Sequence, residues 1–128
     1  SWRHRLVGLH RRRPAHVSRQ HHAAHPVGVD IATRDNIARA FLTLSSRVQP
    51  GDVLFVLLMG HGSGEGAQSK VNLPGPDATA AEYASWLAGF NQQQVVFVNA
   101  ATGSGDFVPV LSAPNRVIVT ATKTAKDE

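Results

Sequence analysis

The first of two glycine-rich stretches, residues 60–66, holds the one ionisable side chain outside the N-terminal segment that suits acid–base chemistry. This is His61, whose imidazole ring can donate or accept a proton. Gly62 beside it can offer an unhindered backbone N–H, and Ser63 adds a hydroxyl. The stretch therefore places an ionisable ring next to a backbone donor and a hydroxyl.

The second stretch, residues 99–105, offers small polar groups and no strong nucleophile. Asn99 and Ser104 can form hydrogen bonds with a ligand, whereas Ala101 carries only a methyl group. Because the chain contains no cysteine, it has no thiolate that could attack a carbonyl carbon. Cysteine-type peptide hydrolysis is excluded on that ground alone.

Hydrophobic periodicity indicates the elements that position these two stretches. Thr33 is a suitable N-cap for one helix, and Thr79 with Glu82 forms the T-x-x-E pattern of a capping box for another. Short apolar runs rich in valine predict the strands. The expected elements are a helix over residues 34–47, a strand over 53–59, an extended piece over 71–73, a helix from 79, a strand over 95–99, a short helix over 107–111 and a strand over 116–120.

The alternation of strands and helices predicts an α/β fold, a parallel sheet with crossover helices on its faces. The run over residues 53–59 is apolar without a break, which is typical of a strand buried on both faces. Both glycine-rich stretches follow the carboxyl end of such a strand, where parallel sheets place their ligand sites. We therefore expect His61 and Ala101 to face one crevice.

Over residues 52–122 the chain resembles the legumain and caspase clan of cysteine peptidases. The resemblance lies in a hydrophobic strand followed by His-Gly-Ser-Gly at 61–64, and a second strand followed by Asn-Ala-Ala-Thr-Gly-Ser-Gly at 99–105. The family's nucleophilic cysteine falls on Ala101, which is 40 residues after His61 (101 − 61). The chain is most similar to bacterial caspase-like proteins that lack this cysteine.

The resemblance implies a caspase-like three-layer fold, incomplete at the C-terminus and at the N-terminus. It implies an inactive pseudopeptidase that binds a peptide or protein segment in its crevice as a regulatory or binding module. The implied roles are the dyad histidine for His61, the position of the missing cysteine for Ala101, the oxyanion hole for Gly62 and the crevice wall for Ser63, Asn99 and Ser104.

Two other interpretations of the same residues are a hydrolase, which stays open, and a dinucleotide-binding loop, which is set aside. A hydrolase of the same fold could use Ser63, Ser104 or Thr102 if the hydroxyl lay within hydrogen-bond reach of His61. The glycine spacing over 60–66 resembles a dinucleotide fingerprint, but no helix follows in register and no acidic residue matches the ribose position. No cofactor is expected.

A change in composition divides the chain into a basic segment, 1–30, and the α/β domain, 31–128. Segment 1–30 holds six arginines, six of the seven histidines and one acidic residue, whereas the remainder is slightly acidic, with seven Lys or Arg against eight Asp or Glu. Lacking apolar periodicity, the segment is expected to be disordered, or to be an out-of-frame translation of GC-rich DNA. Nucleic-acid binding through its arginines and metal capture by His21, His22 and His25 are weaker alternatives.

The sequence also bounds location and assembly. No apolar run approaches the roughly 20 residues of a membrane-spanning helix, and the N-terminus lacks the apolar core of a signal peptide. We therefore expect a soluble domain with no membrane partner, and composition sets neither its compartment nor its oligomeric state.

Overall fold

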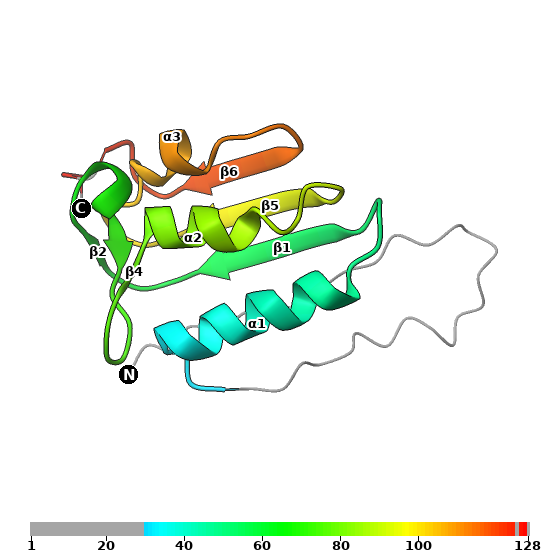
Figure 1. Ribbon diagram of the computed structural model, residues 1–128. Helices are drawn as coiled ribbons and strands as arrows, with labels where there is room; N and C mark the ends of the chain where they lie inside the picture. The colour runs from blue at the N-terminus through cyan, green and yellow to red at the C-terminus, as the bar shows by residue number, and fades with distance from the viewer. Residues whose placement is uncertain (1–29, 125, 128) are drawn as a thin grey trace.

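A computed structural model describes residues 30–124, 126 and 127 of the chain. Within these residues the longer helices and strands alternate along the sequence, as Figure 1 shows. The longer elements agree with the periodicity of the sequence to within a residue or two at their ends. The elements are α1 (Arg34–Arg47), β1 (Val53–Leu58), β2 (Gly62–Ser63), the short 3-10 helix η2 (Gly66–Gln68), β3 (Lys70–Val71), β4 (Ala78–Thr79), α2 (Ala80–Leu87), β5 (Gln94–Asn99), α3 (Phe107–Leu111) and β6 (Arg116–Thr120).

The main sheet is parallel, with the strand order β1-β5-β6. In its register Leu58 lies beside Asn99, which lies beside Thr120, so the three strands end at one edge. This arrangement confirms the α/β fold with a parallel sheet. It also brings the two glycine-rich stretches, which follow β1 and β5, to the same edge.

The helices α1, α2 and α3 form one layer against one face of this sheet (Figure 1). Aromatic rings join the layer to the sheet: Phe41 of α1 lies with its ring centroid 6.3 Å from that of Tyr83 of α2. The Tyr83 ring in turn lies 5.5 Å from Phe97 of β5. Edge-to-face contacts of this kind add to the stability that burial of the rings supplies.

Alternating burial along β1 corrects one expectation from the sequence. The strand was expected to be buried on both faces, but Leu54, Val56 and Leu58 are buried whereas the residues between them are half-buried. In β6 the alternate residues Val117 and Val119 are 56% and 47% exposed. Among the described residues helices cover only one face of the sheet. An unbroken apolar run in the sequence does not indicate which of its side chains face those helices.

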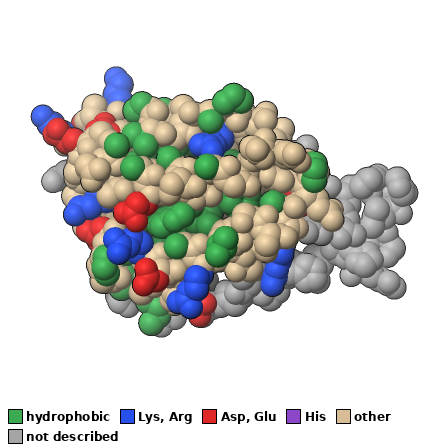
Figure 2. Space-filling model, viewed as in Figure 1, with side chains coloured by type: hydrophobic (Ala, Val, Ile, Leu, Met, Phe, Trp, Pro, Cys, Tyr) green, Lys and Arg blue, Asp and Glu red, His purple; other side chains and the backbone are tan. Residues whose placement is uncertain are grey.

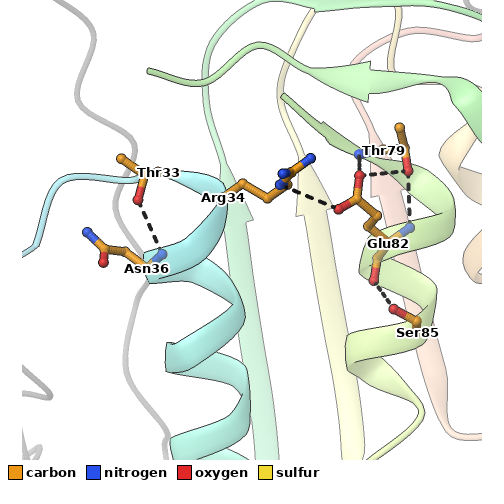
Figure 3. A network of polar contacts seen from close by, with 6 residues as sticks. All are labelled: Thr33, Arg34, Asn36, Thr79, Glu82 and Ser85. Carbon is orange, nitrogen blue, oxygen red and sulfur yellow. Dashed lines mark hydrogen bonds and ion pairs between the residues drawn. The ribbon is translucent and has the colours of Figure 1, made fainter. Parts of the chain in front are cut away.

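Helices α1 and α2 begin as their capping residues predict, and an ion pair joins their first turns (Figure 3). The Thr33 hydroxyl accepts a hydrogen bond from the backbone N–H of Asn36, and Thr79 with Glu82 forms the complete capping box. Arg34 Nε lies 3.9 Å from Glu82 Oε2. These contacts fix the register of α2, which leads into β5 and the second glycine-rich loop.

A second, antiparallel sheet of three two-residue strands, in the order β2-β3-β4, follows the end of β1. Of this sheet only an extended piece over 71–73 was expected, and β3 (Lys70–Val71) lies next to it. Gly62 pairs with Val71 and Ser63 with Lys70, and strands this short carry no periodicity. The small sheet fixes the loop that contains His61 and Gly62.

The basic N-terminal segment lies almost entirely outside the described residues, so its expected disorder, nucleic-acid binding and metal capture stay predictions. No helix in the described part of the chain is long and apolar enough to cross a membrane. In the view of Figure 2 basic and acidic side chains of the described residues lie interspersed.

Candidate functional site

The candidate site is a pocket between the loops that follow β1 and β5, at the edge of the sheet where both strands end. Its volume is about 540 Å³. Residues 62–65 form one wall and residues 102 and 103 another, and Lys126 and Asp127 complete it. The position agrees with the rule that parallel sheets bind ligands beyond the carboxyl ends of their strands.

Gly62 on one wall lies close against Thr102 on the other. Its backbone N–H donates a hydrogen bond to Thr102 Oγ1 at 3.2 Å. A Cβ atom at this position would lie 2.2 Å from the Thr102 carbonyl oxygen and 3.0 Å from that of Lys70. The loops can lie this close together because residue 62 has no side chain.

His61 is exposed, and its ring does not line the pocket. Its carbonyl oxygen accepts a hydrogen bond from the Asn72 N–H at 2.8 Å, which holds the backbone in place. Among the described residues none forms a hydrogen bond with the imidazole. A histidine that acts as a catalytic base normally has such a partner to orient the ring.

Ala101 is buried, with none of its surface exposed, and belongs to the hydrophobic core cluster. Its backbone N–H donates to Asn99 Oδ1 at 3.0 Å. Asn99 is itself fully buried, and its Nδ2 has no hydrogen-bond partner among the described residues. The structure therefore brings Asn99 and Ala101 together just beneath the pocket, without placing either on its wall.

Ser63 and Ser104 differ in position. Ser63 is exposed on the pocket wall, and its hydroxyl donates a hydrogen bond to Asn72 Oδ1 at 3.3 Å. Ser104 is 1% exposed and does not line the pocket. Its Oγ accepts from the N–H groups of Ala121 and Thr122, at 3.2 and 3.3 Å.

These contacts bear on the alternative in which an alcohol replaces the thiol. The hydroxyl of Ser104 is used to hold the turn after β6, and that of Thr102 accepts the Gly62 N–H. In the described part of the chain no hydroxyl hydrogen-bonds to His61, which an activated alcohol requires.

Sequence reasoning missed the contribution of the turn after β6. Thr122 Oγ1 accepts hydrogen bonds from the N–H groups of Ser104 and Gly105, at 2.8 and 3.2 Å. Gly103 N–H donates to the Asp127 carbonyl oxygen at 3.0 Å. These contacts join residues about twenty positions apart, and no local pattern in the sequence indicates them.

The site offers no arrangement that would hold a metal ion, since the described residues contain no group of three His, Cys, Asp or Glu side chains placed for one. In comparisons with known proteins, no family model and no curated protein matches the chain.

Proposed function

We propose that this chain is a catalytically inactive, caspase- and legumain-like module that binds an extended peptide segment in the pocket between its two glycine-rich loops. The observation that carries the proposal is the pairing of Gly62 with Thr102. It unites the His-Gly-Ser-Gly loop with the loop in which Ala101 stands where the family has its cysteine. The three-layer caspase-like fold is part of this proposal.

Inactivity follows from the chemistry of the groups present. The Ala101 methyl group cannot attack a carbonyl carbon, and the hydroxyls nearby form other hydrogen bonds than one with His61. Loss of the nucleophile removes turnover but leaves the shape of a crevice unchanged. Recognition can therefore persist without cleavage.

A peptide suits the pocket because its walls consist largely of backbone and small side chains. Residues 62–64 and Gly103 present peptide groups, and Ser63 adds a hydroxyl. Backbone N–H and C=O groups recognise the main chain of an extended segment, as in strand addition to a sheet edge. Glu65 and Lys126 place one charge of each sign at the rim, both on exposed side chains.

The test is retention of a mixed peptide library by the full chain, with the retained and unretained peptides identified by mass spectrometry. We expect retained peptides to be intact. Ser63→Arg, which fills the pocket from its wall, should lower retention at least tenfold. Ser85→Arg, a matched change at an exposed position of α2, should not.

Two results would reject the proposal. Equal retention by the wild-type chain and Ser63→Arg would show that peptides bind elsewhere or not at all. Cleavage activity that stays with the wild-type chain through purification and is absent from His61→Ala would favour the hydrolase with an alcohol nucleophile.

A further inference from the structure

Two backbone N–H donors on the pocket wall are satisfied by oxygen atoms of the chain itself. Gly62 N–H donates to Thr102 Oγ1 at 3.2 Å, and Gly103 N–H donates to the Asp127 carbonyl oxygen at 3.0 Å. All four residues line the pocket. An incoming ligand that uses these donors must therefore displace the two oxygens.

The Thr102 oxygen can be displaced without unfolding the loop. Its distance from the Gly62 nitrogen is at the long end of the range for an N–H···O hydrogen bond. Thr102 is only partly buried, and rotation about χ1 would move its hydroxyl away from Gly62 without moving the backbone. A ligand carbonyl oxygen is the better acceptor for a peptide N–H.

The Asp127 carbonyl oxygen is held on the wall by contacts within an exposed turn. Asp127 Oδ2 accepts from the Thr124 N–H at 2.9 Å, which shapes the backbone next to Gly103. The neighbouring Lys126 Nζ lies 3.8 Å from Glu65 Oε1, and these side chains are 82% and 71% exposed. An ion pair this exposed contributes little, so Asp127 is held on the wall chiefly by its hydrogen bonds with Thr124.

We infer that oxygen atoms of Thr102 and Asp127 accept the hydrogen bonds of the Gly62 and Gly103 N–H groups in place of a ligand. On peptide binding, two carbonyl oxygens of the bound segment replace them. The inference rests on the proposed function and adds a regulatory property to it: the empty pocket is held in an autoinhibited state. Removing the Thr102 hydroxyl, or the Asp127 side chain that helps to hold its carbonyl oxygen on the wall, should strengthen binding, in contrast to the usual result of mutating a binding site.

The variants for the test are Thr102→Val, which removes the acceptor and nearly keeps the shape, and Asp127→Ala, which removes the bond to Thr124 N–H. The matched controls are Thr43→Val on α1 and Lys123→Ala, which lies in the same turn as Asp127 and is exposed. Each test variant should retain library peptides about fivefold more tightly than wild type, the effect of one ordinary hydrogen bond. The controls should match wild type.

Amide hydrogen exchange, followed by NMR without peptide, gives a readout that does not depend on binding. Exchange at Gly62 N–H should be faster in Thr102→Val, and exchange at Gly103 N–H should be faster in Asp127→Ala. Faster exchange together with tighter retention supports the inference. If wild type retains peptides and the variants retain them equally or less, the inference fails and the proposed function stands. If none of the chains retains any peptide, the proposed function fails and the inference falls with it.

Discussion

Replacing Gly62 by alanine should destabilise the protein by about 2–4 kcal/mol. The added Cβ would lie 2.2 Å from the Thr102 carbonyl oxygen, whereas real Cβ contacts are essentially never shorter than 3.0 Å. The two loops must therefore move apart by roughly 1 Å, which takes the Gly62 N–H beyond hydrogen-bond reach of Thr102 Oγ1. Overpacking typically costs about 1–3 kcal/mol and the lost hydrogen bond about 1 kcal/mol more.

The assay is urea unfolding followed by tryptophan fluorescence, since Trp86 packs against Phe41 and Tyr83. With a slope of about 1–3 kcal/mol per molar urea, the midpoint should fall by roughly 1 M or more. Gly89→Ala is the control, because its Cβ would lie at an ordinary 3.5 Å from Ser45 Cβ. If Gly62→Ala unfolds at the same urea concentration as Gly89→Ala, the two loops do not touch as described and the reasoning is wrong.

Two further predictions concern buried groups outside the pocket wall, Ser104 and Tyr83. Ser104→Ala leaves the N–H groups of Ala121 and Thr122 without their acceptor and should lower the free energy of unfolding by about 1–3 kcal/mol. The control Ser85→Ala, on the α2 surface, should lower it by under about 0.5 kcal/mol. Equal urea midpoints for the two variants would contradict the role given to Ser104. Burial, and then the charge of Glu82, raises the pKa of Tyr83 well above its usual value. Because the unfolded chain loses this proton at about pH 10 and the folded chain keeps it, stability should fall as pH rises above about 10. Free energies of unfolding from pH 8 to 11 should show a smaller fall in Tyr83→Phe, and an identical fall would refute this account of Tyr83.

Local signals in the sequence were sufficient to predict the main elements. Thr33 is the N-cap of α1 and Thr79 is the N-cap of α2, because each side chain accepts a hydrogen bond from a backbone N–H that the first helical turn leaves free. The valine-rich runs form β1, β5 and β6. What local signals could not give is the burial of each strand face, which depends on where the helices pack.

The candidate site was harder to predict because its geometry depends on contacts between distant residues. Burial alternates at the end of β5, so Asn99 and Ala101 are buried while Ala100 between them is exposed. Ser104 is buried because the turn after β6 binds its hydroxyl, 17 and 18 residues further along the chain. The sequence could indicate which loops meet, but not which of their side chains reach the pocket.

The central claim, that the chain binds peptides and that Ala101 stands in place of a nucleophile, is tested most directly by peptide cleavage. The wild-type chain, Ala101→Cys and the matched control Ala100→Cys would each be incubated with the same peptide library and the products read by mass spectrometry. We predict that wild type and Ala100→Cys leave the peptides intact, and that Ala101→Cys cuts them in a reaction that a further His61→Ala change abolishes. Cleavage by the wild-type chain, or an Ala101→Cys variant that folds and cuts nothing, would contradict the account.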